Sequence, residues 1–253
     1  MIKSKSSAEI ATLREGGKRL AEILNKLARV VRPGVKTSDL DKLARELIKQ
    51  NGDGPSFLNY QPAGAPAPYQ FALCVSVNDE VVHGMPSERI LQNGDIASLD
   101  LGLKHDGLFT DMAITVPVGQ ITREAQELLD TTKHALEQGI LAAKPGAHIS
   151  DIGAAVEAVA KEHGYGLVRD LGGHGVGYKV HEEPMIANFG PAGEGPVIQP
   201  GWVLAIEPML NLGGWRVKFL DDGYTVKTAD GSLSAHFEQT IVVTESGAGI
   251  LTQ

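Results

Sequence analysis

The chain carries one stretch of sequence twice. Residues 32–52 read RPGVKTSDLDKLARELIKQNG and residues 144–164 read KPGAHISDIGAAVEAVAKEHG, and the two align without gaps at an offset of 112 positions. Both copies open on a Pro-Gly turn and continue with apolar residues at helical spacing, so each predicts a turn followed by a helix. A chain that repeats a unit of this size is expected to fold as two similar halves.

A longer helix is predicted before each copy. Ser6 and Glu9 have the spacing of a capping box, and apolar residues then recur at helical spacing up to the first Pro-Gly turn. The second long helical pattern covers about residues 122–143. We therefore predict a single domain of all 253 residues, with two internal repeats at roughly 6–118 and 119–245.

Acidic residues occupy matching positions in predicted strands of the two halves. LQNGDIASLDLGL matches IQPGWVLAIEPML at an offset of 107 positions and sets Glu207 at the position of Asp100. LFTDMAITV resembles HFEQTIVVT more loosely and sets Glu238 near Asp111. Each half therefore supplies two strand carboxylates.

The first pair of acids lies in a predicted β-hairpin. The Asp-Gly pair at 106–107 is a strong signal for a two-residue turn, because both residues tolerate positive φ and apolar runs flank them. Pairing the strands about this turn sets Gly102 opposite Asp111 and Asp100 opposite Ala113. The two carboxylates then point to one face as diagonal neighbours, about 7–8 Å apart at the backbone.

The two faces of this hairpin differ in character. The face away from the acids is apolar and is predicted to be core. The face with the acids carries small residues, which are expected to leave space beside the carboxylates. If the hairpin is considered alone, the alternative is that the face with the acids is an outer face exposed to solvent. The apolar residues are Leu99, Leu101, Leu103, Met112, Ile114 and Val116, and the small residues are Ser98, Gly102, Ala113 and Thr115.

Four carboxylates that converge between two halves indicate a metal site, because burying each of them as a free ion costs several kcal/mol. Three histidines, His83, His174 and His181, lie in or beside predicted loops, and glycines flank His174. The run GHGVG superficially resembles a dinucleotide-binding loop, but no strong strand precedes it and no helical pattern follows. A lone histidine is more often structural, whereas three near four acids favour a functional site.

This set of residues suits divalent ions. Carboxylates with an imidazole bind Mn, Fe, Co or Zn, and two such ions about 3.5–4 Å apart activate a water and polarise a carbonyl oxygen, which is hydrolase chemistry. The single cysteine, Cys74, rules out a zinc-thiolate set. Neither H-E-x-x-H nor G-x-S-x-G is present.

Composition narrows the class of partner and the compartment. The formal net charge of -8 argues against nucleic acid or an anionic membrane as the main partner, although solubility alone would explain it. One cysteine excludes an intrachain disulfide, the N-terminal residues contain no apolar signal core, and nowhere do 18 apolar residues run together. The sequence therefore favours a cytoplasmic protein without a membrane partner.

Over essentially its whole length the chain resembles the type I methionine aminopeptidases. That resemblance implies an α+β, duplicated pita-bread fold: a curved antiparallel sheet with helices on its outer face and a pseudo-twofold axis at the metal site. It implies two divalent ions, Co, Mn, Fe or Zn, with Asp111 and Glu238 bridging them, Asp100 completing one site, and His174 with Glu207 completing the other.

The resemblance also implies roles for other residues. Water activated by the two metal ions would attack the first peptide bond, with Glu207 as proton shuttle. His181 would hydrogen-bond the scissile peptide, and His83 would assist at the leaving nitrogen or the tetrahedral intermediate. The α-amino group of the substrate would bind the ion held by Asp100. Walls of the methionine pocket are expected at Tyr69, Cys74 and Tyr224.

Some positions depart from the family pattern. Tyr224 stands where the family usually has Trp, Val180 where many bacterial members have Phe, and Gln239 where His is common. These differences affect the expected shape of the pocket and not the metal ligands. The Ala/Pro-rich segment NYQPAGAPAPYQF, residues 59–71, is either a lip for the substrate or a stiff connection.

We expect this hydrolase to remove the initiator methionine from nascent proteins whose second residue is small. It is predicted to act as a monomer on N-terminal peptides, with transient ribosome contact and no nucleic acid substrate. One alternative is an Xaa-Pro aminopeptidase or prolidase of the same fold, although these normally carry an additional N-terminal domain. The other is a non-catalytic binding protein, which typically loses ligands that are all present in this chain.

Overall fold

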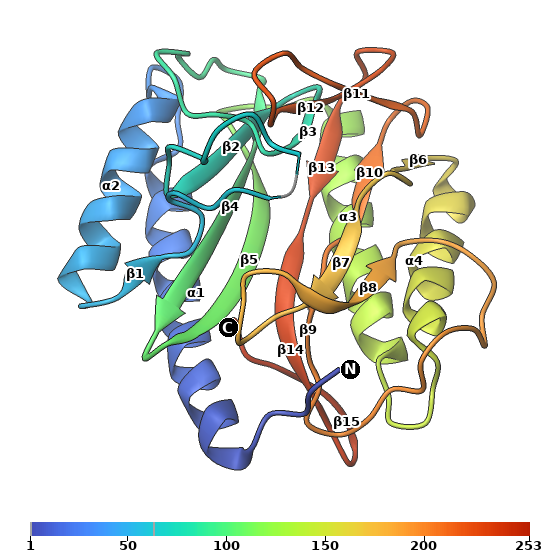
Figure 1. The fold of residues 1–253 in the computed structure, drawn as a ribbon. Coiled ribbons are helices and arrows are strands. Elements are labelled where there is room, and N and C mark those ends of the chain that lie inside the picture. The colour runs from blue at the N-terminus through green and yellow to red at the C-terminus, as the bar shows by residue number, and fades with distance from the viewer. Residues whose placement is uncertain (1, 63) are drawn as a thin grey trace.

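Four helices and a curved, mostly antiparallel arrangement of strands make up the part of the chain that is described, residues 2–62 and 64–253 of a computed structural model (Figure 1). The helices are α1 (Ser7–Val30), α2 (Thr37–Gln50), α3 (Arg123–Ala142) and α4 (Ile149–His163). The strands are β1 (Gly54–Pro55), β2 (Leu73–Val77), β3 (Glu80–Val82), β4 (Ile96–His105), β5 (Leu108–Pro117), β6 (Gly166–Leu167), β7 (Gly172–Gly175), β8 (Glu182–Ala187), β9 (Val203–Ile206), β10 (Met209–Asn211), β11 (Val217–Phe219), β12 (Val226–Thr228), β13 (Ser234–His236), β14 (Glu238–Thr244) and β15 (Gly247–Ile250).

The long helices begin at the residues that the sequence predicts. The Ser6 hydroxyl accepts a hydrogen bond from the Glu9 amide, and the Glu9 carboxylate accepts one from the Ser6 amide, so the capping box at the start of α1 is confirmed. Thr122 caps α3 by accepting a hydrogen bond from the amide of Ala125. In the described chain, no helix has the length and apolar character needed to cross a membrane.

The main sheet has the strand order β1-β4-β5-β14-β9-β7-β8, with β2 also paired to β4 and β15 to β14, and all these pairs are antiparallel. The hairpin of β4 and β5 has the predicted register, with Gly102 opposite Asp111 and Asp100 opposite Ala113. Asp106 (φ 44°) and Gly107 (φ 87°) both have positive φ, as a primed two-residue turn requires. The register prediction is therefore confirmed.

Helices cover the outer face of this sheet, α1 and α2 over one half and α3 and α4 over the other (Figure 1). The leucine face of β4 packs against α1 and α2, so its prediction as core is confirmed, and β9 and β14 pack in the same way against α3 and α4. Burial of these apolar faces leaves the opposite face of the sheet, with its acids, turned away from the helices. The first contact includes Leu20, Leu24, Leu40, Leu99 and Leu101, and the second includes Leu136, Ile152, Leu204, Ile206 and Ile241.

The two halves meet where β5 lies beside β14. Glu238 pairs with Ala113 and Gln239 with Met112. The Thr240 hydroxyl reinforces this seam, because it accepts a hydrogen bond from the Asp111 amide at 2.9 Å and donates one to the Asp111 carbonyl at 2.8 Å. The seam thus brings acidic residues from both halves to one point of the inner face.

The C-terminal residues complete the packing around this seam. The Leu251 amide donates a hydrogen bond to the Thr240 carbonyl, and the Thr240 amide donates one to the Thr252 hydroxyl. A side chain at Gly17 of α1 would collide with the carbonyl oxygen of Leu251, 2.5 Å from its Cβ position. Helix α1 and the C-terminal segment therefore touch backbone to backbone.

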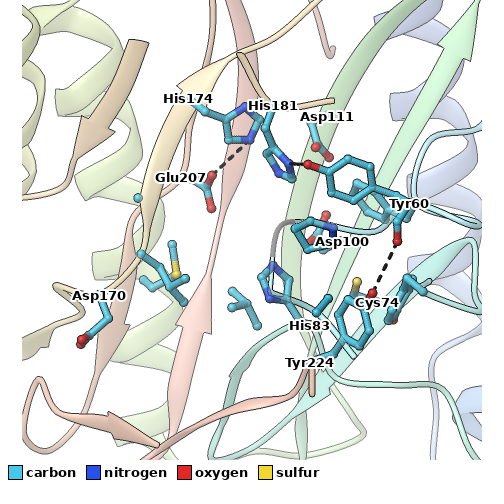
Figure 2. A pocket seen from close by; sticks show the side chains of 18 of the residues that line it. Tyr60, Cys74, His83, Asp100, Asp111, Asp170, His174, His181, Glu207 and Tyr224 are labelled. Atoms are coloured by element: carbon cyan, nitrogen blue, oxygen red, sulfur yellow. Dashed lines mark hydrogen bonds and ion pairs between the residues drawn. The ribbon is translucent and has the colours of Figure 1, made fainter. Parts of the chain in front are cut away.

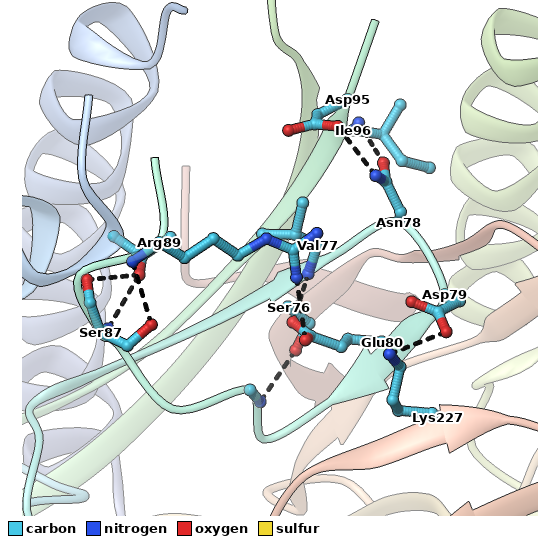
Figure 3. Close-up of polar contacts among 12 residues, drawn as sticks. Ser76, Val77, Asn78, Asp79, Glu80, Ser87, Arg89, Asp95, Ile96 and Lys227 are labelled. Atoms are coloured by element: carbon cyan, nitrogen blue, oxygen red, sulfur yellow. Dashed lines mark hydrogen bonds and ion pairs between the residues drawn. The ribbon is translucent and has the colours of Figure 1, made fainter. Parts of the chain in front are cut away.

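A polar network fixes the turn between β2 and β3 (Figure 3). The Glu80 carboxylate accepts hydrogen bonds from the Val77 amide at 2.8 Å and from Arg89 at 3.0 Å. Asn78 has a backbone φ of 61°. Its side-chain amide donates a hydrogen bond to the Asp95 carboxylate and accepts one from the Ile96 amide. Strand β3 follows this turn and leads to His83, which itself has a φ of 58°.

Candidate active site

The five residues predicted as metal ligands lie together on the inner face of the sheet, and Figure 2 labels all of them except Glu238. They come from β4 (Asp100), β5 (Asp111), β7 (His174), the residue after β9 (Glu207) and β14 (Glu238). Their side-chain atoms form overlapping groups in which every ligand atom lies within 4.8 Å of the others. These groups are Asp100, Asp111 and Glu238; His174, Glu207 and Glu238; and Asp111, His174 and His181.

Burial changes the acidity of all four carboxyl groups. It raises the pKa of Asp100 to about 7 and that of Glu207 to about 8. The pKa values of Asp111 and Glu238 rise well above their usual range, because burial is reinforced by the charges of neighbouring acids. Without cations, this cluster would take up protons at neutral pH.

The cluster also satisfies the requirements of a metal site. Oδ1 of Asp100 and Oε1 of Glu238 are buried and have no hydrogen-bond partner among the described residues. A buried carboxylate oxygen of this kind needs either a proton or a cation. Carboxylate oxygens with one imidazole are the ligands that Mn, Fe, Co and Zn accept, so the residues present fit divalent metal ions.

His174 has the tautomer that a metal ligand needs. Its Nδ1 lies 2.9 Å from the carbonyl oxygen of Gly175, to which it donates, so Nε2 carries the lone pair. Nε2 faces the acids and lies 3.5 Å from Oε1 of Glu207. Burial lowers the pKa of His174 to about 3, which keeps the ring neutral and able to bind a metal ion.

The other two predicted histidines border the same cavity. The ring centroid of His181 lies 4.3 Å from that of His174, and its Nδ1 lies 2.8 Å from the phenol oxygen of Tyr60. His83 lies on the other side of Asp100 (Figure 2), and burial lowers its pKa to about 4. Both rings therefore border the space beside the acids.

The main cavity, with a volume of about 590 Å³, runs from the acids to an apolar end. The predicted pocket residues Tyr69, Cys74 and Tyr224 all line it, and Cys74 pairs with Asp100 across β2 and β4. The Tyr224 hydroxyl donates a hydrogen bond to the Ala67 carbonyl at 2.6 Å. The 59–71 loop, of which Ala63 lies outside the described residues, thus forms a wall of the cavity and is more than a connection.

One expectation about this face is wrong. The small residue Gly102 was expected to leave open space beside Asp111, but the structure fills that space. A Cβ at Gly102 would lie 2.7 Å from the Ser56 hydroxyl and 2.9 Å from a ring carbon of Phe57. Gly102 therefore makes room for Phe57, which lines the apolar end of the cavity.

His236 is a residue near the site that the sequence analysis missed. It is buried, and its Nε2 lies 3.4 Å from Oε2 of Glu207, whereas His174 lies near Oε1 of the same carboxylate. The Thr115 hydroxyl holds its backbone by hydrogen bonds to both the amide and the carbonyl of His236. Its position two residues before Glu238 was the available signal, because alternate strand residues share a face.

Comparison with known proteins identifies the family. Residues 11–245 match the model of metallopeptidase family M24. The chain belongs to metallopeptidase family M24. It is 45% identical over 252 residues to a methionine aminopeptidase of Clostridium perfringens, a match that spans 100% of this chain and 99% of that protein. This M24 chain therefore falls among the methionine aminopeptidases, as the sequence motifs predict.

Solved structures confirm the predicted pita-bread fold of this M24 chain. The crystal structure of methionine aminopeptidase from Thermotoga maritima superposes with a TM-score of 0.96 at 40% identity, over the full length of both chains. A prolidase from Pyrococcus furiosus superposes with a TM-score of 0.75 at 23% identity, over 99% of this chain and 65% of that one. The prolidase match shows a shared fold, whereas the methionine aminopeptidase match also extends to the sequence.

Proposed function

We propose that this M24 metallopeptidase removes the initiator methionine from proteins whose second residue is small, using two divalent ions. The observation that carries the proposal is the convergence of three buried acids, the partly buried Glu207 and a neutral imidazole, from both halves of the chain, beside an apolar cavity. The full-length similarity to methionine aminopeptidases supports the same reaction.

The ligand groups suggest how two ions would be shared. Glu238 belongs to the group with Asp100 and to the group with His174, and Asp111 also reaches both sides. We therefore assign Asp111 and Glu238 as bridging ligands, Asp100 to one ion, and His174 with Glu207 to the other. Bound there, the two ions would supply an activated water and polarise the carbonyl of the first peptide bond.

Three residues of the chain are assigned to handle protons and the peptide. Glu207 lies between two imidazoles with a carboxylate directed at the cavity, and we assign it as the proton shuttle. His181, held by Tyr60, would donate from Nε2 to the scissile peptide. His83 is partly buried and stays neutral because its pKa is lowered to about 4, and we assign it to the leaving nitrogen or the tetrahedral intermediate.

The shape of the cavity explains why only the first residue would be removed. Tyr69, Tyr224 and the 59–71 loop close the apolar end behind the acids. A methionine side chain fits against this aromatic wall, since sulfur contacts aromatic rings favourably. A peptide chain cannot continue through the wall, so the α-amino group must end at the acids, beside Asp100.

The remaining parts of the proposal rest on the resemblance to the family. The substrates would be the N-terminal peptides of nascent proteins in the cytoplasm, and the enzyme would act as a monomer with transient ribosome contact. The ion would be Co, Mn, Fe or Zn. Neither nucleic acid nor a membrane would be a partner.

One titration tests the proposed reaction. Metal-stripped protein is loaded separately with Mn, Fe, Co or Zn, and release of methionine from Met-Ala-Ser is measured, with Asp111→Asn as control. We expect metal-dependent release that the variant loses. Turnover of Xaa-Pro peptides without turnover of Met-Ala-Ser would favour a prolidase-like enzyme. Absence of cleavage with every ion would favour a binding protein.

A further inference from the structure

A second hollow opens from the main cavity. This side groove, with a volume of about 800 Å³, shares His174, His181 and Met185 with the main cavity. Tyr178 and Lys179, from the turn after β7, line its other wall. The two hollows are therefore continuous past the imidazole that we assign to the scissile peptide.

Met185 lies at the junction of the two hollows. It pairs directly with His174 across β7 and β8, so both side chains point to the inner face of the sheet. Its side chain is 69% exposed, and Tyr178 in the same groove is 37% exposed. An isolated exposed apolar residue needs no explanation, but two in a groove that leads out of a peptidase site indicate a surface for the substrate.

The direction of the substrate follows from the position of the closed end. Cys74 and Tyr224 lie on one side of the acids, and His174 lies on the other (Figure 2). A peptide whose first side chain points toward Cys74 and whose amino group lies by Asp100 reaches the side groove by continuing past His174. The next feature along that path is Met185.

The chemistry of the groove suits a variable peptide. The flexible thioether of methionine adapts to different surfaces, and tyrosine offers both an apolar ring and a hydroxyl. Lys179 and Glu183 place both signs of charge at the groove, and Glu182 is already paired with Lys5. A surface of this kind favours no particular side chain, as an enzyme that acts on many different proteins requires.

We propose that the side groove binds the third and following residues of the substrate peptide, through Met185 and Tyr178. This inference rests on the proposed function and adds to it a dependence on peptide length. Longer substrates are expected to bind more tightly, because they bury the exposed faces of these two residues, while ordering of the peptide offsets part of the gain.

The test compares kcat/KM for Met-Ala-Ser with kcat/KM for a hexapeptide that adds three uncharged residues to its C-terminus. For the wild type we expect a ratio of about ten in favour of the hexapeptide, which corresponds to about 1.4 kcal/mol. The difference should lie in KM, because Met185 and Tyr178 would contact peptide residues beyond the scissile bond. In Met185→Ser the ratio should fall to about two.

Phe219 provides a matched control. It is 64% exposed and borders the main cavity but not the side groove, so Phe219→Ser should keep the wild-type ratio. A fall of the kcat/KM ratio in Phe219→Ser but not in Met185→Ser would overturn the proposal, because the peptide would then extend past Phe219 and not through the side groove. A wild-type ratio near one, with Met-Ala-Ser cleaved, would overturn the role of the side groove and leave the proposed function in place. Cleavage of neither peptide would overturn the proposed function as well.

Discussion

The phenol oxygen of Tyr60 lies 2.8 Å from Nδ1 of His181, and the two rings lie 5.2 Å apart between centroids. The bond joins the 59–71 loop to the segment before β8, residues that lie 121 positions apart in the chain. Burial raises the pKa of Tyr60, so its phenol stays protonated and can donate to Nδ1. The proton of the neutral imidazole is then left on Nε2, the nitrogen assigned to the scissile peptide.

Tyr60→Phe should therefore lower kcat/KM for Met-Ala-Ser about threefold to tenfold, the range that one hydrogen bond of about 0.5–1.5 kcal/mol supplies. The affinity for metal ions should stay unchanged, since Tyr60 is not a ligand. Steady-state kinetics and calorimetric metal titration check both points. Tyr165→Phe is a suitable control, because Tyr165 stacks on His163, at the end of α4. Equal activity of Tyr60→Phe and wild type would contradict the assigned role of this bond.

The acids of the site predict that the free energy of unfolding of the metal-free protein depends on pH in an unusual way. Glutamate titrates near pH 4 in unfolded chains, whereas burial raises the pKa of Glu207 to about 8. Between these values the folded state binds more protons than the unfolded state, so the contribution of Glu207 to the free energy of unfolding decreases as pH rises. Metal ions that bind only the folded state should remove this loss.

Glu207→Gln isolates this effect from the other titrating groups. In EDTA, the Tm of the variant should rise relative to that of the wild type between pH 5 and pH 8, as measured by thermal unfolding. With Mn added at pH 8, the order should reverse, because the wild type gains more from the ion. A constant difference in Tm across this pH range would show that the carboxyl group of Glu207 is not destabilised by burial.

Lys5 and Glu182 form a buried ion pair between the N-terminal segment and β8. The Lys5 side chain is 1% exposed, and its ammonium group also lies 4.5 Å from the ring centroid of Tyr178. Lys5→Met should lower the free energy of unfolding by about 3 kcal/mol, because the Glu182 side chain, only 17% exposed, then loses its ion-pair partner. The double variant with Glu182→Gln should recover part of this loss in urea unfolding. A double variant less stable than Lys5→Met would contradict this account.

Gly102→Ala should alter the pocket without removing a ligand. The added methyl would displace Ser56 and Phe57, of which Phe57 borders the apolar end of the main cavity. We expect KM for Met-Ala-Ser to rise about tenfold, equivalent to about 1.4 kcal/mol. Metal affinity should change little in calorimetric titration. Gly54→Ala is a milder control, since a Cβ there has its nearest contact at 3.7 Å. A large loss of metal affinity in Gly102→Ala would point to movement of Asp111 instead of Phe57.

Local sequence signals were sufficient for the helices and for the first pair of acids. A capping box set the start of α1, and one Asp-Gly turn set the register of β4 and β5. Both signals act within a few residues, so no long-range information was needed. By contrast, the Tyr60 contact with His181 and the place of His236 depend on how distant segments pack, which neither periodicity nor turn chemistry encodes.

The division into two repeats, at roughly 6–118 and 119–245, remains a prediction. It is supported by α2 and α4, which begin at Thr37 and Ile149 and so keep the offset of the repeated sequence. The looser match of the second acid pair has a structural reason. A two-residue turn joins β4 to β5, whereas residues 207–237, which form β10 to β13, separate β9 from β14. Inserted segments of that length free the two strands to change their relative register.

The contact of Gly17 in α1 with Leu251 and the bond from Thr240 in β14 to Thr252 place residues 251–252 against both α1 and β14. Glu238, the acid of β14, thus lies in a strand that packs against residues synthesised after it. A growing copy of this protein therefore exposes its own amino end long before it can assemble a site that cuts one. Any trimming of a new copy during synthesis would fall to an older, finished molecule.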